Sequence, residues 1–403
     1  MLAILAGTDS SAAQLPLEML LVFGAAKLLS GIFEHLKQPG IVGQIAAGIL
    51  IGPSVLGWVE PNDFILTLAE LGVMFLLFKV GLEVKASEFM KVGKTAGLVA
   101  SLGVLVPLAC GWLLGLAWNH SQIESIFIGA AMVATSVGIT AEVLAAKGLL
   151  QARASRIILA AAVIDDVLGL IVLAVVTSIA QGAVNLVQLA LTATLSIGFT
   201  LIVARWGTHA MGVILPRLHH RLSSGEAPFT LAMCLLFGLS LLAVYAGVAA
   251  IIGAFLAGMA LSETVGRRVH DLTAGVAELL VPFFLVSIGL RFSLEAFSNA
   301  STLVFAFVIL IAAVGSKLVG CGLGAIGAGK ADVFRIGVGM VPRGEVGMVV
   351  AQIGLAMSVV SDSVFGVVVF MSVMTTIIAP PLLKWAFKGV ARDAPAERDF
   401  RIG

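Results

Sequence analysis

The sequence predicts an all-α membrane protein with 13 transmembrane helices, in which two inverted six-helix repeats are joined by a linker helix. Three observations support this prediction: long apolar segments, basic residues confined to alternate loops, and motifs that recur about 210 residues later. Of the 403 residues, 60% are hydrophobic and 12% are charged, against about 25% charged in soluble domains. A soluble fold cannot bury this much apolar surface, whereas a bilayer accommodates it.

The apolar segments are expected to be helices, because a backbone in lipid must satisfy its own hydrogen bonds. In chain order they cover 16–36, 40–58, 64–82, 93–118, 123–146, 154–180, 185–206, 229–246, 248–263, 275–292, 300–327, 331–358 and 361–387. The first repeat is expected over 16–180, the linker helix at 185–206 and the second repeat over 229–387. An N-terminal extracytoplasmic tail, 1–15, and a C-terminal cytoplasmic tail, 388–403, flank them.

Lys and Arg in the connecting loops predict the orientation. They follow the odd-numbered spans, where the basic residues are Lys37, Lys85, Lys91, Lys94, Lys147, Arg153, Arg156, Arg205, Arg217, Arg221, Arg267, Arg268, Lys330 and Arg335. After the even-numbered spans stands Arg291 alone. Basic loops stay in the cytoplasm, so the N-terminus is expected outside and the C-terminus inside. That orientation requires an odd number of spans.

The two halves of the chain repeat each other at a nearly constant offset. GQIAAGILIG from Gly43 resembles GAFLAGMALS from Gly253, and FLLFKVGLEV around Gly81 resembles FFLVSIGLRF around Gly289. VATSVGIT lies opposite VPRGEVGM at the same spacing. This spacing equals seven spans, an odd number, so the second copy is expected upside down relative to the first. Inverted repeats are typical of secondary transporters, whose site lies between the copies near the midplane.

A few charged residues fall at the middle of predicted spans. Asp165 and Asp166 lie about ten residues from the basic end of their span, roughly 14 Å into a core of ~30 Å. Glu345 and Lys317 lie at similar depth in later spans, and Arg343 is close to Glu345. Each charge at a helix centre costs about 2.5–3.5 kcal/mol, so such residues are retained for pairing or function.

Two spans are predicted to break at this depth. GVGMVPRGEVG contains Pro342, which removes a backbone donor and clashes with the preceding turn. Its counterpart reads ATSVGIT and offers Thr135, Ser136 and Gly138. Broken helices expose carbonyls and half-helix dipoles at the midplane.

These groups predict a site for a small, hard cation. Carboxylates, hydroxyls and carbonyls are oxygen ligands suited to Na⁺, and we expect transient Na⁺ binding by Asp166, Asp165 and Thr135. The same carboxylates bind protons as a coupled group. A site that holds either protons or Na⁺ exchanges one for the other by competition.

Structural interpretations remain open for the same residues. The two aspartates can both pair with donors at helix ends, and Lys317 can form a permanent ion pair. Arg343 and Glu345 can neutralise the half-helix ends at the break. Thr135 and Ser136 can cap the second half of the earlier broken span.

Other functions also remain to be weighed. A K⁺/H⁺ exchanger fits the same motifs, and a channel or a non-transporting sensor can be built on the same scaffold. An intramembrane aspartyl protease is disfavoured, because its two carboxylates face each other from separate helices, whereas Asp165 and Asp166 are neighbours. No catalytic residues and no nucleic-acid partner are expected.

The motifs resemble those of the monovalent cation:proton antiporter family, second branch, and within it the NapA-type bacterial Na⁺/H⁺ antiporters. The similar segments are GQIAAGILIGPSVLG, FLLFKVGLE, VATSVGITAEVL, AAVIDDVLGLIVLA and GVGMVPRGEVGMVVAQIGL, within about residues 16 to 387. The resemblance implies the antiporter fold, in which a core domain formed by the third to sixth spans and their repeat mates moves against a dimerisation domain. It also implies a homodimer in the plasma (inner) membrane of a prokaryote, where the antiporter would serve pH homeostasis.

The resemblance also implies roles for individual residues. Asp166 would be the main ion- and proton-binding carboxylate, and Asp165 would form a salt bridge with Lys317 that breaks as the site loads. Glu345 and Arg343 would stabilise the crossing of the broken helices. Electrogenic exchange of two protons per Na⁺ is implied, with no cofactor besides the transported ions. No nucleotide-binding domain is expected, in contrast to the gated K⁺-efflux relatives.

Overall fold

The computed structural model describes residues 10–85, 91–180, 186–219, 227–292 and 299–390, and within these ranges every regular element is a helix. The elements are α1 (Ser10–His35), α2 (Gly40–Ile51), α3 (Asp63–Glu83), α5 (Gly93–Ala117), α6 (Gln122–Ala131), α7 (Val137–Ala146), α8 (Arg153–Ala180), α9 (Leu186–His219), α10 (Ala227–Tyr245), α11 (Ala250–Leu261), α12 (Arg267–Leu290), α13 (Ala300–Gly324), the 3₁₀ turn η3 (Ile326–Ala328), α14 (Lys330–Gly339), α15 (Glu345–Ala356) and α16 (Asp362–Ala386). The all-α prediction is therefore confirmed for the part of the chain described.

Each predicted span coincides with one helix or with one pair of consecutive helices. Eight of the described helices are long and apolar enough to cross a membrane. Both predicted breaks are present, since α6 and α7 are separated at 132–136 and α14 and α15 at 340–344. The expected tails fall largely at 1–9 and 391–403, which lie outside the described residues.

Several helix ends differ from the prediction for local reasons. α2 ends at Ile51 rather than at 58, because Pro53 holds the preceding Gly52 in an extended conformation. α12 begins at Arg267 rather than at 275, and its first turns, RRVHDLTA, are too polar for a hydropathy window to detect. α9 likewise continues through a basic segment to His219.

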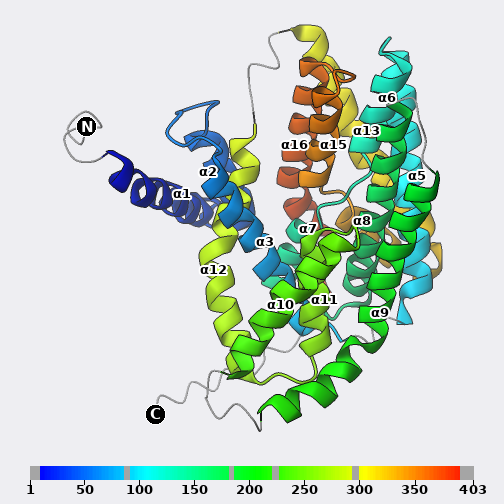
Figure 1. Cartoon of the computed structure of the whole chain (residues 1–403). Helices are drawn as coiled ribbons and strands as arrows, with labels where there is room; N and C mark the ends of the chain where they lie inside the picture. The colour runs from blue at the N-terminus through cyan, green and yellow to red at the C-terminus, as the bar shows by residue number, and fades with distance from the viewer. Residues whose placement is uncertain (1–9, 86–90, 181–185, 220–226, 293–298, 391–403) are drawn as a thin grey trace.

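The helices pack as two groups. One contains α1, α2, α3, α10, α11 and α12; the other contains α5, α6, α7, α8, α13, α14, α15 and α16. In Figure 1 the first group lies to the left and front, with α1 at its outer edge, and α5 and α6 lie at the opposite edge. α9 packs mainly against α11 and also contacts α8. α3 packs mainly against α11 and α12, so the third span does not belong with the fourth to sixth as the resemblance implied.

Glycine pairs let helices of the first group cross in backbone contact. A Cβ at Gly48 of α2 would lie 2.1 Å from the carbonyl oxygen of Val286 in α12, beside Gly289. A Cβ at Gly81 of α3 would lie 2.2 Å from the carbonyl oxygen of Phe255 in α11. Such close approach is available only to small residues, and dispersion contacts between the helices then replace contacts with lipid.

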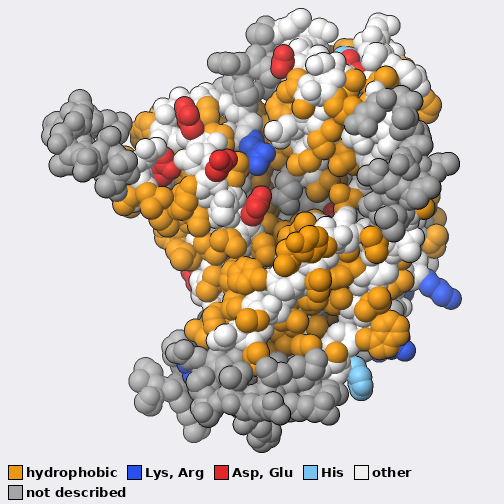
Figure 2. Space-filling model, viewed as in Figure 1, with side chains coloured by type: hydrophobic (Ala, Val, Ile, Leu, Met, Phe, Trp, Pro, Cys, Tyr) orange, Lys and Arg blue, Asp and Glu red, His pale blue; other side chains and the backbone are white. Residues whose placement is uncertain are grey.

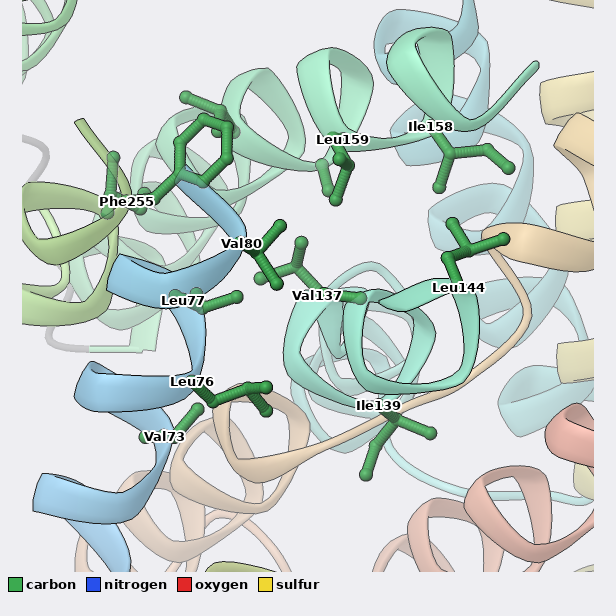
Figure 3. Close-up of a cluster of buried hydrophobic side chains, with 14 of the residues drawn as sticks. Val73, Leu76, Leu77, Val80, Val137, Ile139, Leu144, Ile158, Leu159 and Phe255 are labelled. Carbon is green, nitrogen blue, oxygen red and sulfur yellow. The ribbon is translucent and has the colours of Figure 1, made fainter. Parts of the chain in front are cut away.

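The boundary between the two groups is apolar. Figure 3 shows Val73, Leu77 and Val80 of α3 facing Val137 of α7, with Leu159 of α8 nearby. These side chains are almost fully buried. They belong to the largest apolar cluster among the described residues, and this cluster holds the first group against the helices that carry the breaks.

Candidate ion-binding site

The two interrupted helices cross at their breaks. The backbone N–H of Ser136 donates to the carbonyl oxygen of Pro342 at 2.8 Å. The hydroxyl of Thr140 donates to the carbonyl oxygen of Gly339 at 2.7 Å. A Cβ at Gly344 would lie 2.7 Å from the Cβ of Ser136, so glycine is required where the two broken segments meet. Each break therefore satisfies some of the backbone groups that the other break frees.

Arg343 joins the crossing to a third helix. Its side chain is fully buried, and Nη1 donates to the carbonyl oxygens of Val133 at 3.1 Å and Ala134 at 3.3 Å. Nη2 donates to the carbonyl oxygen of Ala313 in α13 at 3.1 Å. The guanidinium thus lies at the carboxyl end of α6, where a cation compensates the helix dipole. The side chain of Glu345, its expected partner, lies outside the part described.

Asp165 and Lys317 form a buried ion pair at this level. Lys317 Nζ lies 2.9 Å from Asp165 Oδ1, and both side chains are 0% exposed. Asp165 Oδ2 also accepts the backbone N–H of Thr135 at 3.0 Å. The pair expected between α8 and α13 is therefore formed, and it is tied directly to the first break.

Space for this pair is left by Gly103 of α5, which sequence reasoning missed. A Cβ at Gly103 would lie 2.6 Å from Cys321 Sγ and 3.4 Å from Lys317 Nζ. No sequence signal separates Gly103 from the many other glycines of the chain.

Asp166 is next to Asp165 on α8 and is 4% exposed. Adjacent side chains leave a helix about 100° apart, so the carboxylates of Asp165 and Asp166 point in different directions from α8. Thr135 is 4% exposed, and its hydroxyl lies 3.5 Å from the carbonyl oxygen of Met340. Ser136 stands at the N-cap of α7, but its side chain makes no capping hydrogen bond, so the capping interpretation fails for Ser136.

Two threonines of α16 complete the crossing and were also missed. Thr375 Oγ1 accepts the backbone N–H of Arg343 at 3.1 Å, and Thr376 Oγ1 donates to the Arg343 carbonyl oxygen at 2.8 Å. Their signal was present in the sequence, because they follow Asp165 and Asp166 by the repeat offset of about 210 residues.

The described residues contain no cluster of three or more His, Cys, Asp or Glu side chains suited to a tightly bound metal. Two carboxylates, a threonine hydroxyl and carbonyls released at the breaks lie in one layer instead. This donor set is chemically suited to a weakly held monovalent cation.

Residues 20–389 match the transmembrane sodium/hydrogen exchanger family. The chain belongs to this family. It is 32% identical to the high-affinity Na⁺/H⁺ antiporter NhaS3 of Synechocystis, an alignment that covers 95% of this chain and 92% of that protein. It is also 32% identical to the Na⁺/H⁺-K⁺ antiporter GerN of Bacillus cereus, over 92% and 95% of the two chains. The sodium proton antiporter MjNhaP1 of Methanocaldococcus jannaschii has a similar fold, with a TM-score of 0.72 over 95% of this chain and 97% of that one, at 18% identity.

In this exchanger, one cavity opens between the two helix groups near the second break. Its volume is about 340 Å³, and α3, α11, α12 and the first turn of α15 line it. Glu70 and Arg291 contribute charged groups. Figure 2 shows this face hollowed between the groups, with charged side chains around the hollow and a broad apolar band below.

A smaller polar cavity of about 210 Å³ lies between α1, α2, α3, α7 and α12. Lys79, Glu142 and Gln44 line it together with Lys27 and Glu278, whose charged atoms are 3.7 Å apart. Lys79 and Glu278 therefore belong to one polar cluster between these helices.

Proposed function

We propose that this chain is a secondary transporter that exchanges Na⁺ or Li⁺ for protons across the membrane. The observation that carries the proposal is the buried Asp165–Lys317 pair at the crossing of two broken helices, beside Asp166. A buried ion pair is costly to keep without a function. Similarity to the antiporters NhaS3 and GerN supports the same activity.

The proposed cycle uses competition at the carboxylates. A cation binds Asp166 with help from Thr135 and carbonyls of the breaks, and it displaces the one proton that Asp166 holds. Lys317 then separates from Asp165 and releases one proton. When the cation leaves, Asp166 and Lys317 each take up a proton and Lys317 pairs with Asp165 again. Two protons per Na⁺ follow from this scheme, which makes the exchange electrogenic.

Alternating access is proposed to occur by movement of the helices that carry the breaks against the group that contains α3. The apolar boundary in Figure 3 supports this, because few directional bonds oppose sliding there. The cavity with Glu70 and Arg291 lies along the same boundary and would admit ions from the extracytoplasmic side.

We further propose 13 membrane crossings, with the six-helix repeats inverted about the linker α9. Matched turns support the repeat: backbone conformations with positive φ recur about 210 residues apart at Lys37 and Gly247, Asn119 and Gly329, and Gly148 and Ser358. The bias of Lys and Arg supports an extracytoplasmic N-terminus and a cytoplasmic C-terminus in a prokaryotic plasma membrane. A homodimer is proposed from the family resemblance, and crosslinking in native membranes would test it.

Proteoliposomes that hold a pH gradient test the function. Addition of Na⁺ or Li⁺ should release protons from wild type and from the matched surface variant Asp63→Asn, but not from Asp166→Asn. Full activity of Asp166→Asn would overturn the site assignment. Currents far above exchanger turnover without proton movement would indicate a channel, and folded protein that is silent with every cation would indicate a sensor.

K⁺/H⁺ exchange is the second candidate, because GerN, a relative of equal identity, is a Na⁺/H⁺-K⁺ antiporter. Proton release with K⁺ at concentrations where Na⁺ is ineffective would favour it.

A further inference from the structure

A third cavity with charged residues lies away from the ion-binding layer, at the face that the loop charges assign to the cytoplasm. Its volume is about 600 Å³. The turn between α1 and α2, the end of α7 with the turn after it, and the end of α16 surround it. Lys37, Lys147, Lys384 and Lys388 line it, and none of the residues that line it is acidic. The proposed exchange mechanism uses none of these lysines.

The four charges are not neutralised within the described structure. Among the ion pairs formed by the described residues, none involves these lysines. Lys384 instead donates to the carbonyl oxygen of Lys37, which carries no net charge. Residues 391–403 offer three arginines against three acids, so the sequence that follows is not an acidic counterpart. Four like charges around one cavity favour occupation by an anion.

The backbone conformation at Lys37 also supports an anion site in this cavity. Lys37 has φ 59°, in the left-handed region that favours glycine, and its repeat counterpart Gly247 has φ 76°. A lysine is therefore kept at a position where the other repeat uses the unstrained residue. The left-handed conformation also occurs at Asn119 and Ser358, so it adds to the argument at Lys37 only because this side chain also lines the cavity.

The interior of the cavity is apolar below the lysines. Leu144, Leu383 and Phe387 line it and are buried. Trp385 also lines it and is 65% exposed, as expected of an aromatic side chain at a membrane surface. A cavity lined by four lysines together with buried apolar side chains suits a phosphate ester with an apolar portion better than a free inorganic ion.

We propose that this pocket binds a phosphate group, supplied by an acidic phospholipid of the cytoplasmic leaflet or by a soluble phosphate compound. Lys37 belongs to the group that contains α3, whereas Lys147, Lys384 and Lys388 belong to or adjoin the helices that carry the breaks. A ligand held by both bridges the boundary along which the groups are proposed to slide. Its occupancy therefore alters the exchange rate, a consequence that rests on the proposed function.

Binding is measured without reference to transport. The full chain in neutral detergent is titrated with phosphatidylglycerol, phosphatidylcholine or pyrophosphate, and the midpoint of thermal unfolding is followed. Phosphatidylglycerol should raise the midpoint of wild type. Lys37→Gln/Lys384→Gln should need about 25-fold more ligand, because each lysine near an acidic headgroup contributes about fivefold. The matched control Lys94→Gln/Lys330→Gln removes two exposed lysines of the same face that do not line the pocket.

Each outcome decides the proposal. A response to phosphatidylglycerol but not to pyrophosphate identifies the lipid as the source, and a response to pyrophosphate identifies a soluble phosphate compound. Equal responses to phosphatidylglycerol and phosphatidylcholine, or equal losses in the test and control variants, overturn the site. Lys388→Gln serves if the double variant unfolds, since Lys388 is exposed and makes no side-chain hydrogen bond within the described residues.

Exchange in vesicles with and without phosphatidylglycerol completes the experiment. The lipid-dependent change in rate should disappear in Lys37→Gln/Lys384→Gln and persist in Lys94→Gln/Lys330→Gln. Binding without exchange in any preparation would refute the proposed function and leave the site standing. Exchange without binding would refute the site alone.

Discussion

Removal of Lys317 should destabilise the protein far more than removal of the whole pair. Lys317 and Asp165 are both 0% exposed, with their charged atoms 2.9 Å apart. Lys317→Met would leave the Asp165 carboxylate buried, with the Thr135 N–H as its remaining hydrogen-bond donor among the described residues. Breaking a buried pair in this way costs about 3–5 kcal/mol.

The double variant Asp165→Asn/Lys317→Met should recover most of that loss. The asparagine side chain is neutral and its oxygen can still accept the N–H of Thr135, while methionine fills much of the lysine volume. Replacement of both partners of a buried pair is often neutral in free energy. We therefore expect a coupling free energy of at least about 2 kcal/mol, in the upper part of the range for residues in contact.

Thermal unfolding of wild type, Asp165→Asn, Lys317→Met and the double variant in one detergent measures this coupling. Lys317→Met should melt several degrees below wild type, and the double variant should return close to it. If the two single losses simply add in the double variant, the pair stores no coupling. The argument that its separation and re-formation drive the cycle would then be wrong.

Three further predictions follow from the geometry. Arg343→Lys should lower the free energy of unfolding by about 2–4 kcal/mol and abolish most of the exchange. The reason is that an ammonium cannot reach the three carbonyl oxygens of Val133, Ala134 and Ala313 together. A normal melting temperature with a normal exchange rate would contradict this. Gly48→Ala should destabilise the α2–α12 crossing by more than about 1 kcal/mol. The control Gly24→Ala should not, because a Cβ at Gly24 meets nothing within 4 Å. Similar melting temperatures of the two variants would refute the backbone contact. Apparent Na⁺ affinity should weaken as pH falls, by up to about tenfold per pH unit for one competing proton. Initial exchange rates, measured at several Na⁺ concentrations over a series of pH values, give this affinity. A constant affinity would mean that protons and Na⁺ bind at separate sites.

The positions of the spans were predictable because lipid imposes a simple rule on composition. Apolar segments about 20 residues long leave little choice of structure, and Pro342 marks the second break through its missing N–H. The first break contains no proline, and only the repeat pointed to it. Helix ends were less predictable, because the first turns of α12 and the last turns of α9 leave the apolar layer and lose the hydropathy signal.

The site was predictable where charge made it conspicuous. Asp165 and Lys317 stand out at similar depth in apolar spans, and the family resemblance implied that they form the ion pair that the structure shows. Arg343 stood out equally, yet its partners are carbonyl oxygens, which every residue carries and no sequence pattern distinguishes. Gly103 was invisible for a related reason, because it acts through the space that it leaves, whereas Thr375 was marked only by its repeat offset from Asp165.

The comparison of the two proposed repeats explains why the chain should have one ion site rather than two. Asp165 and Asp166 correspond to Thr375 and Thr376, and Lys317 corresponds to Pro107 of α5. The backbone contact is retained across this change: Thr135 N–H donates to Asp165 at 3.0 Å, and Arg343 N–H donates to Thr375 at 3.1 Å. A second acidic pair would add about 2.5–3.5 kcal/mol of cost for each charge. Threonine supplies the same acceptor to the break without that cost, so the repeated scaffold is kept for movement while the charge is confined to one copy.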